Sequence, residues 1–308
     1  MTIQLPLAAH SAGLAGIMLA MGEAARAASA EIAKAGAEKR TAALKAMAAR
    51  IRSAAPQLLE ANRQDMAAAN AKGISGAMLD RLELNPARIE AMAKGIEDVA
   101  AIADPVGTVL ATWTRPNGLE ISRVRGPIGV IGIIYESRPN VTADAGALCL
   151  RAANAAILRG GSESLHSSRA IADALRAGLA DAGLPKDAIQ LVQTADRAAV
   201  GHLLSGLNGK LDVVVPRGGK SLVARVQDEA RVPVIGHLEG LCHTYIHEKA
   251  DPAKAEAIIV NAKMRRTGVC GAAETLLVDK AAADTKLKPL VTMLLDAGCE
   301  VQIGRAHV

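Results

Sequence analysis

Apolar residues recur at helical spacing through the first third of the chain. Leu44, Met47, Ile51 and Leu58 fall three, four or seven positions apart, which places their side chains on one face of a helix. We therefore expect residues 8 to about 103 to form a helical scaffold. Helix-breaking signals divide this region at Gly36, at Lys72-Gly73 and at Asn85-Pro86.

The hydrophobic period changes at Val109, where a two-residue alternation begins. Residues 109–126 carry Asn117-Gly118 near their centre, a pair typical of the tight turn of a β-hairpin. Trp113 and Leu119 lie in the flanking arms. Because polar residues alternate on both arms, the hairpin is predicted to project from the body and to contact another subunit.

After the hairpin, apolar runs of strand length alternate with segments of helical pattern. The predicted strands are 129–136, 155–159, 189–193, 211–215 and 232–235. The predicted helices are 141–153, 165–182, 197–204 and 220–230. Repeated strand–helix units indicate an α/β fold with a doubly wound parallel sheet. Ligands bind such sheets at the carboxyl ends of the strands.

Two of the predicted strands end in glycine pairs that open helices. RGGSES occupies 159–164 and PRGGKS occupies 216–221. Glycine lets the backbone approach a ligand closely, and the N–H groups of a helix N-terminus bind phosphate. These turns favour a nucleotide site, although both pairs could simply make tight turns. Gly126, Gly129 and Gly132 do not form the GxGxxG fingerprint, so a dinucleotide would bind in a non-standard way.

Cys270 stands in a Gly-flanked loop between a helical pattern over 251–266 and a strand pattern over 274–278. A thiol presented on a turn suits acyl chemistry, because it is a soft nucleophile that forms thioesters. Arg265 and Arg266 lie close in sequence and would favour the thiolate. The alternative for this cysteine is a buried, inert side chain.

The composition narrows the possible partners. Half of the 308 residues are hydrophobic, which is enough for a sizeable core and for two domains. With one Trp, two Tyr and no Phe, aliphatic residues must build that core. The net charge of +5 is compatible with anionic small molecules. No basic run is interleaved with stacking aromatics, so nucleic acid is not an expected partner.

The cysteine and histidine positions bear on redox state and on metals. The cysteines are Cys149, Cys242, Cys270 and Cys299. They are far apart and form no CxxC pair, which indicates reduced thiols in a cytoplasmic protein. His243 and His247 share a face of one predicted strand but lie about 13 Å apart at ~3.3 Å per residue, so no metal site is expected.

No stretch is long and apolar enough to be expected to span a membrane. The apolar segment 5–21 has no preceding positive charge and runs on into further helical sequence. We therefore expect an ordinary N-terminal helix there rather than a signal peptide.

Four long motifs together resemble a known family. They are YESRPNVTADAGALCLRAANAAILRGGSES (135–164), VVPRGGKSL (214–222), PVIGHLEGLCH (233–243) and NAKMRRTGVCGAAETLL (261–277). Their order and wording closely resemble the γ-glutamyl phosphate reductase family of proline biosynthesis, a branch of the aldehyde dehydrogenase superfamily. The resemblance covers nearly the whole chain, to about Val301.

This resemblance implies an NADPH-dependent reduction of L-glutamate 5-phosphate to L-glutamate 5-semialdehyde, with release of phosphate. Cys270 matches the family nucleophile, whose thiolate attacks the acyl phosphate and gives a thioester. Asn140 matches the superfamily's oxyanion asparagine, which holds the developing negative oxygen together with the Cys270 backbone N–H. Hydride from NADPH then yields the aldehyde.

The resemblance also assigns cofactor and substrate residues. Arg159, Ser162 and Glu163 match a segment near the adenosine ribose, and Pro216, Gly218, Gly219 and Ser221 match the second glycine turn. Glu163 would repel a 2′-phosphate whereas Arg159 would attract it, so the NADPH preference comes from the family alone.

Further polar residues receive roles from the same resemblance. Arg138, Arg265 and Arg266 are candidates for the substrate's carboxylate or phosphate, the alternative being solvated surface charges. Glu239 aligns with the general base of hydrolytic aldehyde dehydrogenases. It need not act as a base here, because phosphate is already a good leaving group.

By the same resemblance, residues 1–125 are N-terminal helices with an oligomerisation arm, 126–238 a nucleotide-binding domain and 239–308 the start of a catalytic domain. Family members continue further, so we expect a C-terminally truncated chain that is itself inactive and poorly soluble. The full-length form is expected to be a homo-oligomer, with glutamate 5-kinase as a further partner. The alternatives are an aldehyde dehydrogenase acting oxidatively and a non-catalytic fragment that only binds nucleotide or subunits.

Overall fold

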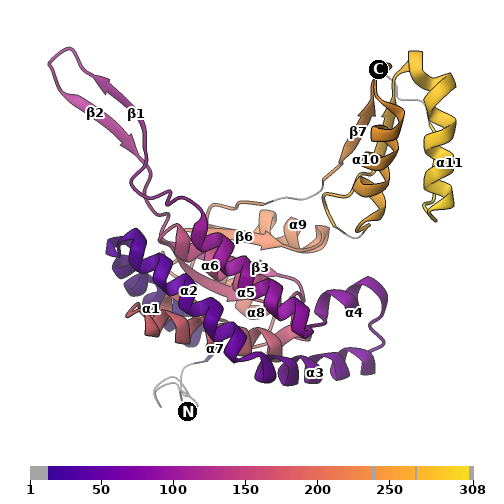
Figure 1. Ribbon diagram of the computed structural model, residues 1–308. Coiled ribbons are helices and arrows are strands. Elements are labelled where there is room, and N and C mark those ends of the chain that lie inside the picture. The colour runs from indigo at the N-terminus through magenta and orange to yellow at the C-terminus, as the bar shows by residue number, and fades with distance from the viewer. Residues whose placement is uncertain (1–12, 237–239, 268, 305–308) are drawn as a thin grey trace. The chain divides into compact units, whose positions relative to one another are not determined.

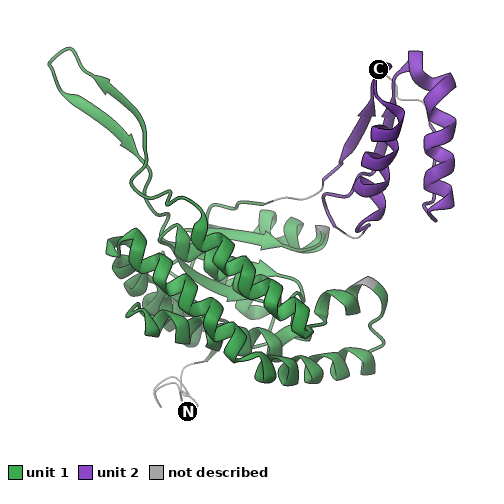
Figure 2. Ribbon diagram, viewed as in Figure 1, with its two compact units in different colours: residues 1–237 green, residues 238–308 purple. Residues whose placement is uncertain are grey.

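The computed structural model describes residues 13–236, 240–267 and 269–304. It divides the chain into two compact units, residues 1–237 and 238–308 (Figure 2). No helix in the described part of the chain is long and apolar enough to cross a membrane.

Helices occupy residues 14–101 with short breaks, as predicted (Figure 1). They are α1 (Leu14–Lys34), α2 (Ala37–Ser53), α3 (Ala55–Ala71), α4 (Gly76–Leu82) and α5 (Pro86–Ala101). The predicted break at Asn85-Pro86 is a helix start, because the Asn85 side chain accepts the backbone N–H of Arg88 at 2.9 Å and Pro86 opens the helix. The break at Ala54 between α2 and α3 was not predicted, since alanine is not a breaking residue.

The predicted hairpin is present as the antiparallel pair β1 (Val109–Thr114) and β2 (Glu120–Val124). Asn117 and Gly118 form its turn. The Asn117 side chain accepts the backbone N–H of Leu119 at 3.2 Å, and Gly118 has a φ of +83°, which favours glycine. All six residues of β1 are exposed.

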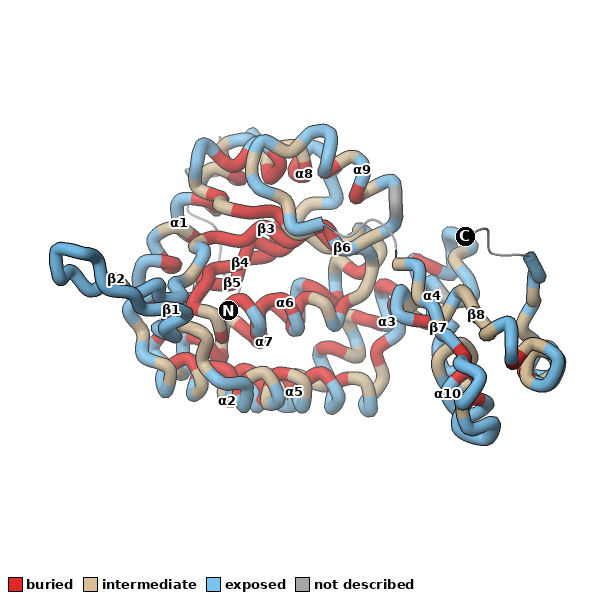
Figure 3. Tube along the Cα trace, turned by 90° about the horizontal axis from the view of Figure 1, so that it is seen from above, coloured by how far each residue is buried: buried red, intermediate tan, exposed pale blue. Residues whose placement is uncertain are grey.

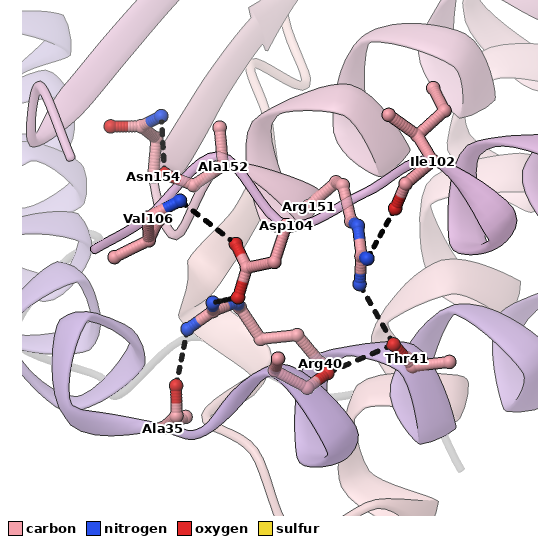
Figure 4. A network of polar contacts seen from close by, with 10 residues as sticks. Ala35, Arg40, Thr41, Ile102, Asp104, Val106, Arg151, Ala152 and Asn154 are labelled. Atoms are coloured by element: carbon pink, nitrogen blue, oxygen red, sulfur yellow. Dashed lines mark hydrogen bonds and ion pairs between the residues drawn. The ribbon is translucent and has the colours of Figure 1, made fainter. Parts of the chain in front are cut away.

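The chain enters the hairpin through a buried polar network (Figure 4). Arg40 pairs with Asp104, whose other oxygen accepts the backbone N–H of Val106 at 3.0 Å. Arg151 donates to the carbonyl oxygen of Ile102. Arg40 is only 2% exposed, and a buried guanidinium is stable only when paired. The segment leading into β1 is therefore fastened to the body of the unit.

A four-stranded parallel sheet forms the centre of the first unit, which confirms the doubly wound α/β fold. Its strand order is β5 (Ile189–Leu191), β4 (Ala155–Arg159), β3 (Val130–Tyr135) and β6 (Val213–Arg217). The helices between and after these strands are α6 (Asn140–Arg151), α7 (Leu165–Asp181), α8 (Ala198–Leu204) and α9 (Lys220–Glu229), with 3-10 turns at Ser162–Ser164 and Lys186–Ala188.

The predicted strand over 232–235 is reduced to a single bridge, between Val214 and Val234. It lies at the edge of the sheet beside β6. Pro233 has no N–H and cannot extend the ladder.

Side chains alternate between the two faces of the sheet, so each strand contributes to two cores. In β3, Ile131 and Ile133 pack with residues of α2, α5, α6 and α7. Val130 and Ile134 point the other way and pack with residues of α1 and α8. Figure 3 shows the sheet between these two sets of helices. Burial on both faces is typical of parallel sheets.

The second unit is small and holds one parallel strand pair. Its elements are β7 (His243–Ile246), α10 (Pro252–Met264), β8 (Thr275–Val278) and α11 (Lys288–Asp296), with short turns at Lys280–Ala282 and Ala283–Leu287. Ile246, Ile259 and Leu290 form part of its core. The helix and the strand predicted on either side of Cys270 are confirmed.

Candidate active site

The carboxyl ends of three neighbouring strands meet at one edge of the sheet in the first unit. β4 and β6 flank β3, and all three run parallel. The two glycine turns, after β4 and β6, therefore lie on either side of the segment 136–140 that follows β3. The chain moves outward from β3 to β5 and then returns to the other side of β3, so this edge is a topological switch point, where doubly wound sheets bind ligands.

Glu136 and Ser137 connect the two glycine turns. The Ser137 hydroxyl donates to the Glu163 carboxylate in the first turn. The Gly219 backbone N–H, in the second turn, donates to the Glu136 carboxylate. Neither connecting residue was predicted, although their place directly after a buried strand, in the YESRPN motif, was the available signal.

The first glycine turn holds a cation and an anion. Arg159, the last residue of β4, donates to the carbonyl oxygens of Gly160 at 2.8 Å and Ala195 at 3.2 Å, and partial burial lowers its pKa. Partial burial also opposes ionisation of Glu163, but hydrogen bonds from Ser137 and Ser162 outweigh it and lower the Glu163 pKa. Glu163 is therefore an anion at neutral pH.

One glycine of each turn packs closely against the segment that follows β3. A Cβ atom at Gly161 would lie 2.1 Å from the Ser137 hydroxyl oxygen, and one at Gly218 would lie 2.9 Å from the Glu136 Cγ atom. These contacts explain Gly161 and Gly218 without a ligand. At the α9 N-terminus, the backbone N–H of Gly219 donates to the Glu136 carboxylate, the kind of oxygen acceptor that helix N-termini favour. Of the other predicted residues, Pro216 lies in β6 and Ser221 in the first turn of α9.

Asn140 is the first residue of α6 and is exposed. Its amide donates to the Asp144 carboxylate at 2.9 Å. An amide has two hydrogens to donate, so this contact leaves Asn140 with capacity for an oxyanion. Arg138 precedes it on the same segment, half-buried, and its backbone N–H donates to the Glu136 carbonyl at 2.7 Å.

Asp65 of α3 holds the start of α7, the helix that follows the first glycine turn. Its carboxylate accepts the backbone N–H of Ser167 at 2.8 Å and the Ser167 hydroxyl at 2.6 Å. It also accepts the backbone N–H of His166 at 3.2 Å. These donors belong to the first turn of α7, so Asp65 caps that helix from a distant part of the chain. No local sequence signal could have indicated this contact.

Cys270 lies in the second unit, in the loop between α10 and β8, and its side chain is exposed. The alternative of a buried cysteine is therefore wrong. Cys242 lies beside it, with its sulfur donating to the Cys270 carbonyl oxygen at 3.4 Å. Arg265 directly follows α10, and both Arg265 and Arg266 are exposed.

Glu239 lies outside the described residues, and its predicted position is not tested. Within the described ranges, no group of three or more His, Cys, Asp or Glu side chains is arranged to hold a metal ion. His243 instead contacts the Leu241 carbonyl oxygen at 2.9 Å.

Comparison with known proteins identifies the family. Residues 8–303 match the model of the aldehyde dehydrogenase family. The chain is 62% identical to the γ-glutamyl phosphate reductase of Rhodopseudomonas palustris (strain HaA2), over 98% of this chain and 70% of that protein. It is 65% identical to that of Rhodospirillum rubrum, over 93% of this chain and 67% of that protein.

A solved structure agrees with these sequence matches. The crystal structure of γ-glutamyl phosphate reductase from Thermotoga maritima matches with a TM-score of 0.85 at 40% identity, covering 91% of this chain and 68% of that one. The expected aldehyde-dehydrogenase-like fold is thereby confirmed. The chain belongs to the aldehyde dehydrogenase family and, within it, to the γ-glutamyl phosphate reductases.

Proposed function

We propose that this chain has the activity of the γ-glutamyl phosphate reductases, the NADPH-dependent reduction of L-glutamate 5-phosphate to L-glutamate 5-semialdehyde in proline biosynthesis. The observation that carries the proposal is the identity of 62% and 65% with curated γ-glutamyl phosphate reductases over nearly the whole chain. This identity favours the reductase over the alternative of an oxidative aldehyde dehydrogenase.

Cys270 is the nucleophile in this proposal. Its thiolate attacks the acyl carbon of the substrate, the bond from that carbon to the phosphate oxygen breaks, and phosphate leaves. The product is a thioester on the Cys270 sulfur. The exposed position of this thiol on a loop supports the role.

Asn140 and the Cys270 backbone N–H stabilise the negative charge that develops on the acyl oxygen. A preorganised donor at such an oxygen typically accounts for about 10²–10³ in rate. Reduction of the thioester gives a thiohemiacetal on Cys270, which collapses to the aldehyde and restores the thiol.

Members of the aldehyde dehydrogenase family use a nicotinamide cofactor, which when bound supplies the hydride. We place NADPH at the carboxyl edge of β4, β3 and β6. The backbone N–H of Gly219 at the α9 N-terminus, which donates to the Glu136 carboxylate, supports a phosphate there. Arg159 would attract a 2′-phosphate, whereas the anionic Glu163 would repel one. The choice of NADPH over NADH therefore rests on the family resemblance.

Substrate and partner assignments complete the proposal. Arg138, Arg265 and Arg266 are candidates to bind the substrate's carboxylate and phosphate. The hairpin β1–β2 is the arm through which copies of the chain associate. Glutamate 5-kinase, which makes an acyl phosphate of this kind, is a proposed partner, and the proposed setting is the cytoplasm.

The test is NADP⁺ reduction with L-glutamate 5-semialdehyde and phosphate. It is made on this chain and on a chimera that continues it with the remaining residues of the Rhodopseudomonas palustris relative. We expect Cys270→Ala to lower turnover by about 10³-fold or more and to leave NADPH binding unchanged, because alanine removes the nucleophile alone. Cys299→Ala, another cysteine of the same unit, is the matched control and should keep full turnover.

Each other outcome identifies an alternative. Turnover that survives Cys270→Ala would contradict the thioester mechanism. Aldehyde oxidation that does not need phosphate would indicate an oxidative dehydrogenase. NADPH binding without turnover in the chimera would leave only the binding function.

A further inference from the structure

Two cysteines that are distant in sequence meet at the amino end of the strand pair β7–β8. Cys242 directly precedes β7, and the loop that carries Cys270 directly precedes β8. The strands are parallel, with His243 beside Thr275, so the segments before them enter at the same edge. The Cys242 carbonyl oxygen accepts the backbone N–H of Glu274 at 2.9 Å and of Thr275 at 3.2 Å. This ladder fixes Cys242 next to the Cys270 loop.

The side chain of Cys242 points at Cys270. Its sulfur lies 3.4 Å from the Cys270 carbonyl oxygen. Standard bond lengths place a Cα atom about 2.4 Å from its own carbonyl oxygen, so the Cys270 Cα lies within about 6 Å of the Cys242 sulfur. The two Cα atoms of a disulfide are usually about 4.4–6.8 Å apart, whereas the bound of about 6 Å runs from the Cys270 Cα to the Cys242 sulfur. Joining the two sulfurs therefore takes a rotation of the side chains together with a movement of the loop that carries Cys270.

The other cysteines have different surroundings. Cys149 is buried in α6, and burial raises its pKa to about 12. The Cys299 sulfur donates to the carbonyl oxygen of Glu300 at 3.4 Å. Cys270 is exposed and Cys242 partly so. An oxidant from solvent can thus reach Cys270, and the thiol placed to react with it next is Cys242.

We propose that Cys242 and Cys270 are an oxidation site, at which a peroxide joins the two sulfurs in a reversible disulfide. First, the Cys270 thiolate attacks one oxygen of hydrogen peroxide. A sulfur–oxygen bond forms, the oxygen–oxygen bond breaks, and hydroxide leaves with the electron pair. Cys270 is now a sulfenic acid.

Second, the Cys242 sulfur attacks the sulfenic sulfur of Cys270. The sulfur–sulfur bond forms, the sulfur–oxygen bond breaks, and the oxygen leaves as water with the Cys242 proton. The two thiols lose two electrons and the peroxide gains them. Two water molecules result once the hydroxide is protonated, and a dithiol reductant reverses the reaction.

The disulfide would protect the proposed nucleophile as well as silence it. A sulfenic acid without a neighbouring thiol is oxidised further to sulfinic and sulfonic acids, which are not restored by thiols. With Cys242 beside it, Cys270 stops at the disulfide. The functional consequence rests on the proposed role of Cys270, whereas the chemistry needs only its exposed thiol.

Peptide mapping tests the proposal directly. The native chain is treated with hydrogen peroxide, its free thiols are blocked with N-ethylmaleimide, and it is digested with trypsin. Cys242 and Cys270 then lie on the separate peptides 232–249 and 267–280. We expect mass spectrometry to find these two peptides linked, with the link removed by dithiothreitol. Cys299→Ser is the matched control and should leave the link in place.

Replacing Cys242 tests whether its thiol protects Cys270 from overoxidation. In Cys242→Ser we expect Cys270 to appear as sulfinic and sulfonic acid that dithiothreitol does not restore. Cys242→Ala, checked by circular dichroism, covers the case in which serine disturbs the fold. Equal overoxidation of Cys270 in the parent and both variants would overturn the proposal, as would a link formed only after unfolding in urea. The readout is mass rather than turnover, so a chain without reductase activity still gives an answer.

Discussion

Burial keeps the Cys149 thiol protonated at neutral pH. Cys149 lies inside α6 and is 6% exposed, and its surroundings raise its pKa to about 12. A thiolate is the reactive form of cysteine, so Cys149 is inert at neutral pH. Exposed Cys270 differs in solvent access, which nucleophilic attack requires. Both residues are cysteines, and their different reactivity comes from their different burial in the fold.

The raised pKa of Cys149 makes stability fall with rising pH. The thiol is protonated in the folded chain, whereas in the unfolded chain it ionises near ~8.5. Its contribution is fully present below about pH 8.5 and is lost progressively as pH rises towards about 12. We expect Cys149→Ala to show a shallower decline in unfolding free energy between about pH 8.5 and 10.

Urea unfolding across that pH range, with a reductant present, measures the difference between parent and variant. Tyrosines and lysines titrate in both proteins, so their contributions cancel in the comparison. Rapid alkylation of Cys149 by iodoacetamide in the folded chain would contradict this account, as would identical slopes for the two proteins.

Sequence patterns predicted the site residues that are local and missed those that depend on the fold. Cys270 and the two glycine turns follow recognisable strand or helix ends, so their positions could be predicted. Glu136 and Ser137 were missed because their partners arrive from neighbouring strands. Whether Asn140 and Cys270 act together on one acyl group stays a prediction of the family resemblance.

At the scale of elements, the N-terminus of α7 depends on a carboxylate from α3. Asp65 is 2% exposed and accepts three hydrogen bonds from Ser167 and His166. We expect Asp65→Ala to lower the free energy of unfolding by about 2–3 kcal/mol, because it leaves buried donors unpaired. Because α7 follows the first glycine turn, NADPH binding should weaken as well.

Urea unfolding and NADPH fluorescence titration measure the two effects of Asp65→Ala. The control is Asp98→Ala, which removes an exposed carboxylate paired with Lys94 within one helix, and little change is expected there. Equal stability of the two variants would show that the Asp65 contacts contribute nothing to α7.

The helices α2 and α7 pack closely where Gly178, which has no side chain, meets Met47. A Cβ atom at Gly178 would lie 2.5 Å from the Met47 backbone nitrogen, and a backbone atom cannot swing aside. We expect Gly178→Ala to destabilise the chain by about 1–3 kcal/mol, the usual effect of overpacking. Gly95 in α5 has no atom within 4 Å of a Cβ placed there. Gly95→Ala should therefore stabilise by up to about 1 kcal/mol.

These opposite signs separate packing from helix propensity. Alanine improves propensity at both positions, so only the contact with Met47 makes Gly178 differ. Thermal or urea unfolding of the two variants measures the signs. A stabilised Gly178→Ala would mean that α2 and α7 cross at a greater distance than described.

The helices and strands were largely predictable, because the local spacing of apolar residues differs between a helix and a strand. Strand and helix patterns in 109–230 match the observed elements within a few residues. The strand predicted over 232–235 is only a single bridge. Its apolar pattern does not show that the segment lies at the edge of the sheet or that Pro233 lacks an N–H group. The close packing of α2 against α7 at Gly178 produces no periodic pattern in the sequence.

For the whole molecule, the structure has two units with separate cores. The helices α2 and α5 share one core with α6 and α7, so the helical region and the sheet belong to the same unit. A sequence pattern identifies helices but does not show which of them share a core. The hairpin contributes no residue to either buried cluster of this unit, and its apolar side chains remain exposed.

Those exposed side chains lead to a prediction about association. Leu110 and Leu119 are both at least half exposed, and Trp113 is 39% exposed. A two-stranded sheet alone is marginally stable, and its unpaired edges invite a further strand. We expect a second copy of the chain to cover the hairpin. Trp113 is the only tryptophan, so its emission should shift to shorter wavelength as protein concentration rises and the indole leaves water.

Sedimentation velocity at the same concentrations shows whether that shift accompanies self-association. Leu119→Lys places a charge on the hairpin and should abolish both the shift and the concentration dependence. Met78→Lys, at an exposed apolar residue of α4, is the matched control and should behave like the parent. If the parent's emission and sedimentation do not change with concentration, the hairpin is not the contact between copies. If both lysine variants dissociate equally, general surface hydrophobicity, and not a specific arm, holds the copies together.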